Sequence, residues 1–392
     1  MRHLHAGHWI GLALFLAVPL ATVAPKGEVV LIALVALALL ARAISRRLYL
    51  QVPRQLTAII LALMLLWGCA SALWAIESGA ALQRAGSLAL LAAAAISMFL
   101  VCDTLVAEER KAARRAAVAG FAVGCVLLII ELSADLPINS VIRGEENVTK
   151  ATILNSALSI VAIMAWPAAL ILRQQNKLWL AIGILLLAFI VLLMGDGNSA
   201  RFAFIAATLV AAVTLNWPDI SRKFVVIVTT LGIAVAPFLP GTLLSPDRWK
   251  DALSGTTDSA IHRLHIWHFS AERISEKPIL GWGLDASRTI PGGDVEVIQA
   301  GASMQLHPHN APLQVWLELG IPGAAGLATI VLIALLSTRR LPGEVQAISL
   351  ATTTAALVIA SLSFGIWQHW WLATLVLTTV AVKVAIADPG RG

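Results

Sequence analysis

The sequence has few charged residues and only three cysteines. Charged side chains make up 13% of the 392 residues and hydrophobic ones 59%, whereas a typical soluble domain has about 25% and roughly 45–50%. This apolar surplus is too large for one soluble core. It excludes a water-soluble enzyme, a disordered chain and a nucleic-acid-binding domain as descriptions of the whole chain. The net charge of +6 is typical of a membrane protein with basic cytoplasmic loops.

The three cysteines, Cys69, Cys102 and Cys125, all fall inside apolar runs, and none lies in a long polar loop. These positions disfavour a disulfide framework, and the sequence has no CxxC metal or redox motif.

Apolar segments long enough to cross a bilayer recur along the whole chain. A spanning helix needs about 20 largely apolar residues. The sequence predicts twelve spans, near 9–24, 28–44, 56–76, 85–102, 116–132, 151–172, 178–194, 200–216, 223–239, 312–336, 345–363 and 368–387. We expect an all-α, polytopic integral membrane protein that forms a single domain over residues 1–392.

The basic residues predict how these spans are oriented. If both termini are cytoplasmic, seventeen lysines and arginines lie on the cytoplasmic side. Five lie on the opposite side outside its long loop, so the positive-inside rule favours this orientation. Residues 1–24 also resemble a secretory signal, with a basic start and a small-residue ending. The alternation of the later loops favours an uncleaved first span instead.

The only large polar insertion covers about residues 240–311, between spans nine and ten. In the predicted topology it faces away from the cytoplasm and is expected to carry short helices. Its His262, His265 and His268 are spaced three apart and could share a helical face that binds a metal ion. There is no HExxH motif or nearby carboxylate triad. The favoured interpretation is an amphipathic interfacial helix over residues 260–274.

A polar stretch, residues 306–320, leads from this loop into span ten. It places His309 just before Pro312, which suits a first helical turn. Gln314 and Glu318 are four residues apart and share one helical stripe. Polar groups at membrane depth usually mark a functional site. Taken alone, the stretch could equally be an N-cap region with solvated histidines.

Arginines on the same side of the predicted topology favour a functional site. Arg201 follows a very short connection between spans seven and eight, so it lies at or below the membrane surface. There it needs an anion or a carboxylate, and Asp196 is the candidate structural partner. Arg263 and Arg288 lie in the long loop. Several arginines around a histidine suit a diphosphate, because guanidinium groups bind phosphate oxygens bidentately.

These motifs together resemble a known family. His309-Asn310, followed by Gly320 and Gly323, is similar to the signature of the bacterial O-antigen ligase and polymerase superfamily. The segments 263–267 and 278–283 resemble that family's outer loop, and residues 199–201 resemble its arginine at the start of a central span. The twelve-span layout also fits.

The resemblance implies a metal-independent, inverting glycosyltransferase without a cofactor. Its donor would be a glycan on a polyprenyl diphosphate, and its acceptor lipid A-core, at the periplasmic face of the bacterial inner membrane. The family's essential histidine corresponds to His309, and its diphosphate-binding arginines to Arg201 and Arg263. We add Arg288 from its charge and location. Asn310 and Gln314 are expected to support the site.

Three alternatives remain at this point. A polymerase would extend the same lipid-linked glycan and differ only in its acceptor. It would favour two arginine-rich outer loops, whereas the loop at 133–150 is short, so ligation is preferred. A transporter or lipid flippase also suits twelve spans, but the polar features gather at the outer end of the spans. A non-catalytic scaffold would not need an arginine at membrane depth.

Overall fold

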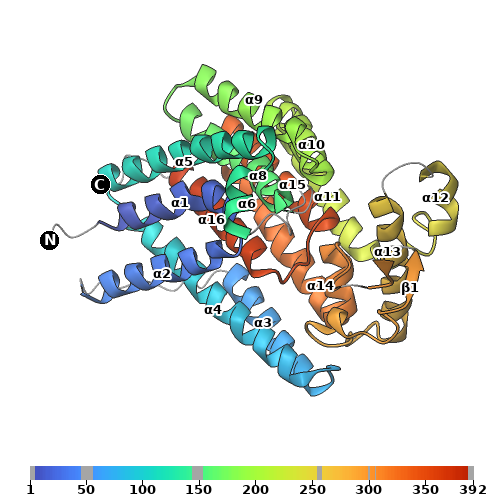
Figure 1. The fold of residues 1–392 in the computed structure, drawn as a ribbon. Coiled ribbons are helices and arrows are strands. Elements are labelled where there is room, and N and C mark those ends of the chain that lie inside the picture. The colour runs from blue at the N-terminus through green and yellow to red at the C-terminus, as the bar shows by residue number, and fades with distance from the viewer. Residues whose placement is uncertain are drawn as a thin grey trace.

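The computed structural model describes residues 5–45, 56–143, 153–253, 258–298, 301–304 and 306–386, and these are almost entirely helical (Figure 1). All twelve predicted spans coincide with helices. These are α1 (Ala6–Val23), α2 (Gly27–Ser45), α3 (Leu56–Ala70), α4 (Ser78–Asp103), α5 (Ala107–Ser133), α8 (Asn155–Arg173), α9 (Leu178–Met194), α10 (Asn198–Asn216), α11 (Pro218–Val235), α14 (Ala311–Ser337), α15 (Gly343–Leu362) and α16 (His369–Ile386).

The helices confirm a polytopic all-α membrane protein. Within the described ranges, ten of them are long and apolar enough to cross a membrane. The other two helices, α9 and α11, are shorter or more polar than a typical membrane span. Helix α9 has 17 residues, or about 26 Å at 1.5 Å per residue, and α11 carries Asp219, Arg222 and Lys223 in its first turns.

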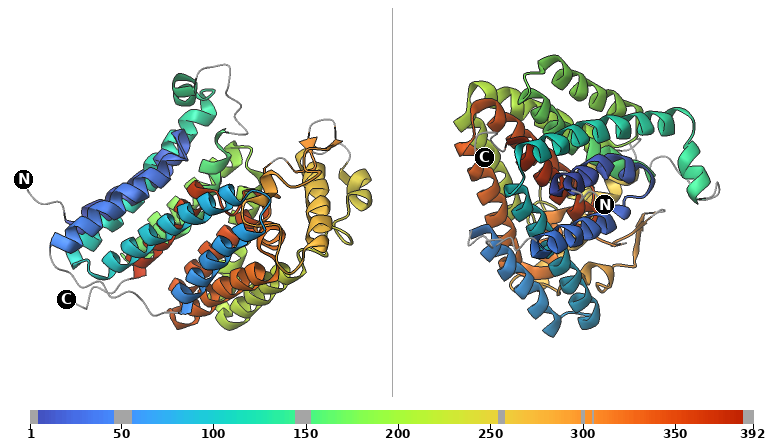
Figure 2. Two further views of the ribbon diagram at one scale, coloured as in Figure 1. Left: turned by 90° about the horizontal axis from the view of Figure 1, so that it is seen from below. Right: turned by 90° about the vertical axis from the view of Figure 1, so that its left-hand side faces the viewer.

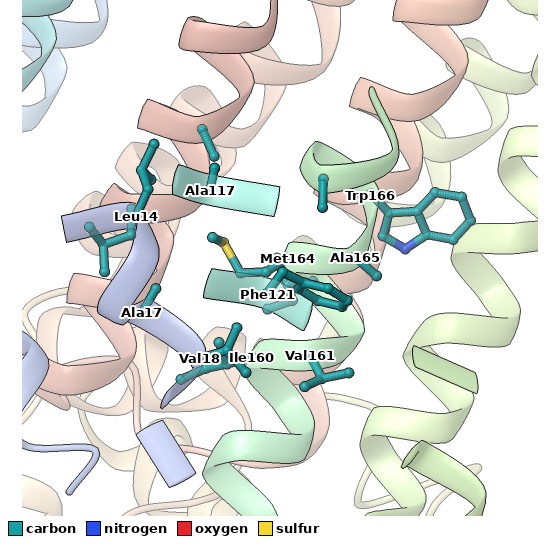
Figure 3. Packing of buried hydrophobic residues seen from close by; sticks show 14 of the residues in the cluster. Leu14, Ala17, Val18, Ala117, Phe121, Ile160, Val161, Met164, Ala165 and Trp166 are labelled. Atoms are coloured by element: carbon teal, nitrogen blue, oxygen red, sulfur yellow. The ribbon is translucent and has the colours of Figure 1, made fainter. Parts of the chain in front are cut away.

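Helix α8 is the central element of the bundle. Its residues from Ala157 to Leu172 are buried throughout, which requires an apolar helix on every face. Figure 3 shows Phe121 of α5 beside Met164 of α8 and Val18 of α1 beside Ile160 of α8, all members of one buried apolar cluster. Helices α1 and α5 approach very closely, because a Cβ on Gly120 would lie 2.1 Å from the Phe15 carbonyl oxygen. Small residues at such crossings are typical of membrane helix pairs.

Ion pairs gather at one end of the bundle. Glu109, at the start of α5, pairs with His5 before α1 and with Arg42 near the end of α2. Lys383 of α16 pairs with Asp103 at the end of α4, with 2.8 Å between Nζ and Oδ2. The two described ends of the chain therefore lie at the same end of the bundle, as an even number of crossings requires.

The opposite end, which we call the loop end, carries the segment between α11 and α14 (Figures 1 and 2). This segment holds α12 (Pro246–Leu253) and α13 (Asp258–Glu276), and then a short antiparallel pair of strands, β1 (Glu296–Ile298) and β2 (Gly301–Ala302). The predicted helix at 260–274 is thus part of α13. Ile266 and Ile274 of α13 pack in one apolar cluster with Leu313 and Leu317 of α14, which fixes the segment on the bundle.

Candidate functional site

Helix α14 is broken close to the loop end. Gly320 has φ +60° and ψ −155°, so two helices meet there, and Pro322 follows inside the second. The sequence predicts one uninterrupted span over this region. The difference arises because a left-handed glycine and a nearby proline both interrupt the backbone hydrogen-bond ladder.

The backbone groups released by this break are bonded by the loop at residues 278–283. The carbonyls of Leu317 and Glu318 accept hydrogen bonds from the amides of Trp282 and Gly283, each at 2.9 Å. In return, the Ile321 amide donates to the Pro278 carbonyl at 3.1 Å. Irregular backbone at membrane depth requires such internal partners. The glycine-containing segments 278–283 and 317–323 are therefore hydrogen-bonded to each other. We call this contact the joint.

We expect Gly320→Ala to prevent this joint from forming. A Cβ at residue 320 would lie 2.2 Å from the Ile279 carbonyl oxygen, and the positive φ adds strain. The yield of monodisperse protein in detergent should fall severalfold. Gly183→Ala in α9 is the matched control, because no atom lies within 4 Å of its added Cβ. A Gly320→Ala variant that matches this control in yield and melting temperature would contradict the interpretation.

Glu318, two residues before the break, holds the site together. Its side chain is fully buried. Oε2 accepts hydrogen bonds from the Asp285 amide at 2.6 Å and from Trp367 Nε1 at 2.7 Å. Oε1 accepts one from Gln314 Nε2 at 3.0 Å and one from the Ser287 hydroxyl. Four donors on two oxygens suit an ionised carboxylate, which can only accept. Glu318 thereby joins α14 to the 284–288 loop and to the start of α16.

His309 lies just before α14 in a left-handed conformation, with φ +55°. Asn310 is the N-cap residue, and its side chain accepts the Leu313 amide at 3.0 Å. The imidazole Nδ1 lies 2.6 Å from the Ser363 carbonyl oxygen. A carbonyl only accepts, so Nδ1 carries the hydrogen and donates it. The neutral ring therefore has its lone pair at Nε2, where it can accept a proton.

The surroundings of the histidine pair disfavour protonation. Burial lowers the pKa of His309, and positive charge at Arg263 and His262 lowers it further, against a raising effect of the Ser363 hydrogen bond. Burial, His309 and Arg288 lower the pKa of His307 to about 3. His307 Nδ1 accepts the His309 amide at 3.3 Å. His307 is therefore neutral at physiological pH and orients the backbone of its neighbour.

Arg263 and Arg288 both act electrostatically on this pair, although they come from α13 and from the loop before β1. Burial lowers the pKa of Arg263, and such a buried guanidinium, still charged near neutral pH, favours an anion nearby. Arg288 Nε donates to Asp285 Oδ1 at 3.2 Å, and the other carboxylate oxygen accepts Arg84 of α4 at 3.1 Å. Asp285 thus holds two arginines in place.

Arg201 has a different setting from the one expected. Its Nε donates to the Leu192 carbonyl at 2.8 Å, and its guanidinium also donates to the Gly195 carbonyl and to Asn198 Oδ1. The sequence suggested Asp196 as the partner of Arg201. In the described residues, these three acceptors bind the guanidinium instead. Arg201 lies in the first turn of α10, and because the next helix, α11, runs to the loop end, α10 begins at that end. Arg201 therefore lies at the same end of the bundle as His309.

The three spaced histidines of α13 do not act together. His262 Nε2 lies 2.9 Å from the Ala302 carbonyl oxygen, and His268 Nδ1 lies 3.2 Å from that of Pro240. Burial lowers the pKa of His265. In the part of the chain that the structure describes, no group of His, Cys, Asp or Glu side chains is arranged to hold a metal ion. The amphipathic-helix interpretation of this segment is therefore the better one.

An apolar cavity of about 370 Å³ adjoins the Glu318 cluster. Its walls come from α3, α4, α14 and α16. Leu284, Leu319 and Trp367 line the part of the cavity next to Glu318. Leu284 and Leu319 are the chain neighbours of Asp285 and Glu318. A long hydrocarbon chain placed in this cavity would therefore begin beside the buried polar cluster.

The structure gathers His309, Asn310, Gln314, Arg263 and Arg288 around the start of α14, and places Arg201 at the same end of the bundle. Sequence reasoning noted Glu318 but did not assign it a role. It missed Asp285, Ser287 and Trp367, which contact Glu318. It also missed Gln368, which contacts His307, and Arg84, which pairs with Asp285. Asp285 and Ser287 directly follow the motif at 278–283, which was the one available signal. Arg84, Trp367 and Gln368 lie far from this motif in the chain, and no sequence signal linked them to the site.

Comparisons with known proteins agree with the predicted resemblance. Residues 151–328 match the family model described as O-antigen ligase. A Rickettsia conorii protein whose name proposes a polysaccharide ligase is 28% identical over 314 residues, covering 78% of this chain and 75% of that protein. A Rickettsia bellii protein with the same proposed activity is 26% identical over 293 residues, or 74% and 71% of the two chains.

Proposed function

We propose that the chain, whose residues 151–328 match the family model described as O-antigen ligase, transfers a glycan from a polyprenyl diphosphate to lipid A-core. The loop end would face the periplasm, with both termini in the cytoplasm of a bacterium and the protein in its inner membrane. The observation that carries the proposal is the geometry of His309. Its Nδ1 is bonded to the Ser363 carbonyl, which leaves the ring lone pair on Nε2, and the charge of Arg263 acts on this ring.

The reaction is a single displacement at the anomeric carbon. The acceptor hydroxyl oxygen forms the new glycosidic bond while the bond to the diphosphate oxygen breaks. His309 Nε2 takes the hydroxyl proton as general base. The leaving diphosphate keeps the bonding electron pair, and its charge is stabilised by Arg263, Arg288 and Arg201. One displacement inverts the anomeric carbon.

Other residues position the reactants. The apolar cavity between α3, α4, α14 and α16 suits the prenyl chain of the donor. Asn310 caps α14 and so fixes the residue that precedes it. Gln314 Oε1 accepts the Ile366 amide at 2.9 Å, which ties the 363–368 connection, including the Ser363 carbonyl, to α14. No metal or cofactor takes part in this scheme.

A transfer assay in nanodiscs tests the proposal. Purified protein receives the polyprenyl-diphosphate-linked glycan with lipid A-core, and separately the donor alone, both with a chelator present. Glycan on lipid A-core is the expected product. Longer glycans on the carrier without transfer to lipid A-core would instead establish a polymerase. Donor binding without either product would favour a transporter.

The rate should depend on pH through His309. Its pKa lies below the ordinary value of about 6.5, and only the neutral ring accepts a proton. We therefore expect kcat/KM to be flat between about pH 7 and 8 and to fall tenfold per pH unit once the pH is below that pKa. The charges of Arg263 and His262 lower this pKa, and the His307 ring lies against the His309 ring, with 4.3 Å between centroids. An acid limb centred above pH 7 would contradict this assignment.

A further inference from the structure

A second cavity, of about 570 Å³, lies beside Arg288. It is bounded by the turn at residues 287–294 and by Ala302 and Met304. Ligand pockets commonly measure 300–1,000 Å³. Unlike the apolar cavity in the bundle, this one offers the side chains of Arg288, Thr289 and Asp294 and the backbone of a glycine-containing turn.

The walls of this cavity are built by backbone hydrogen bonds. Gly292 has φ +77°, a conformation that glycine adopts readily. The amides of Gly293 and Met304 donate to the carbonyls of Ile290 and Gly293, at 3.0 and 2.7 Å. Ile290 and Met304 are buried and form an apolar base. The cavity is therefore shaped before any ligand arrives.

Two contacts tie the cavity to the histidine site. His262 Nε2 lies 2.9 Å from the Ala302 carbonyl oxygen, which fixes one wall to α13 next to Arg263. Met304 is three residues before His307, a reach of at most about 10 Å. Ser287, at the other edge, donates to Glu318 of α14. A ligand seated here would thus lie close to both the histidine pair and the arginines.

We propose that this cavity, which we call the turn cavity, binds a sugar residue of one of the two substrates. The proposal rests on the proposed function. A pyranose offers hydroxyl groups that pair with Asp294, Thr289 and the exposed backbone, and an apolar ring face that suits Ile290 and Met304. Arg288 lies at the rim, where it can reach both the sugar and the diphosphate. The sugar belongs either to the donor glycan or to the acceptor core.

Two variants test the turn cavity without touching the histidine site. Thr289→Trp fills it, and Asp294→Ala removes an acceptor of hydroxyl hydrogens. Val295→Trp is the matched control, because Val295 is exposed on the same turn and its side chain does not line the cavity. Each protein is placed in nanodiscs. Binding is measured by saturation-transfer NMR and calorimetry with two oligosaccharides, released by mild acid from the lipid-linked donor and from lipid A-core.

We expect the Kd of one oligosaccharide to rise at least tenfold in Thr289→Trp and severalfold in Asp294→Ala, and to stay unchanged in Val295→Trp. The oligosaccharide affected identifies the substrate that occupies the cavity. If the wild type binds neither oligosaccharide, or if all variants bind both equally well, the turn cavity is not a sugar site.

Transfer is measured on the same samples so that the two proposals can fail separately. Wild-type transfer with an unchanged KM in Thr289→Trp would overturn the turn cavity and leave the ligase function intact. Sugar binding that is lost in Thr289→Trp, in a protein that transfers nothing, would uphold the cavity and overturn the function.

Discussion

Replacing His309 should reduce glycan transfer by about 10²–10⁴-fold, the usual contribution of a general acid–base group. Without the imidazole, His307 cannot take its place, because His307 Nδ1 accepts the His309 amide and its Nε2 contacts Gln368. Donor binding should remain, since it depends on the arginines and the apolar cavity. The measurement is the initial rate of transfer to lipid A-core, with donor affinity determined in parallel.

Comparing His309→Ala with His309→Asn separates the loss of the base from a loss of folding. His309 has φ +55°, and a left-handed conformation costs alanine about 1–2 kcal/mol. Asparagine adopts it more readily, so His309→Asn should fold like the wild type and still lose transfer. His268→Ala is the control, because its ring makes a hydrogen bond with Pro240 and an ion pair with Glu272, both away from the His309 site. Full transfer by His309→Asn would show that His309 is not the base.

Glu318→Ala is expected to have the largest effect on stability. It leaves two buried and two part-buried donors without their acceptor, and each unsatisfied buried group costs about 1–3 kcal/mol. The loss approaches the whole folding free energy of an ordinary domain, roughly 5–15 kcal/mol. The melting temperature in detergent should fall by about 10 °C or more, and transfer should be lost with it.

The chemistry of position 318 can be separated from its volume. Glu318→Gln keeps the shape but presents an amide NH2 group to donors, so its stability should lie between those of the wild type and Glu318→Ala. Glu108→Ala is the control, because that carboxylate is exposed and pairs only loosely with Lys111, at 4.0 Å. If Glu318→Gln melts like the wild type, the carboxylate is not the acceptor we describe. If Glu318→Ala does so, residue 318 does not hold the loop.

The sequence determined the membrane class, the twelve helices and the segment between α11 and α14. These follow from hydropathy and length, because each span must bury apolar side chains and satisfy its own backbone. The start of α14 was equally readable, since Asn310 and Pro312 are strong signals for a helix N-terminus. Such features depend on residues close together in the chain.

Only the tertiary structure decided how the site is assembled. The sequence places Gln314 and Glu318 on one stripe, but it does not show that Trp367 and Asp285 donate to that carboxylate. It also gives no sign that Ser363 fixes the tautomer of His309. These partners lie between 33 and 54 residues away in the chain.

The same holds for Arg201. Its acceptors are the carbonyls of Leu192 and Gly195 at the end of α9 and Asn198 Oδ1, and not the carboxylate that its sequence neighbourhood suggested. A short-range sequence pattern shows which polar groups will need a hydrogen-bond partner when they are buried. Which partner satisfies each group depends on helix packing, and that packing is set by the whole apolar surface of the bundle.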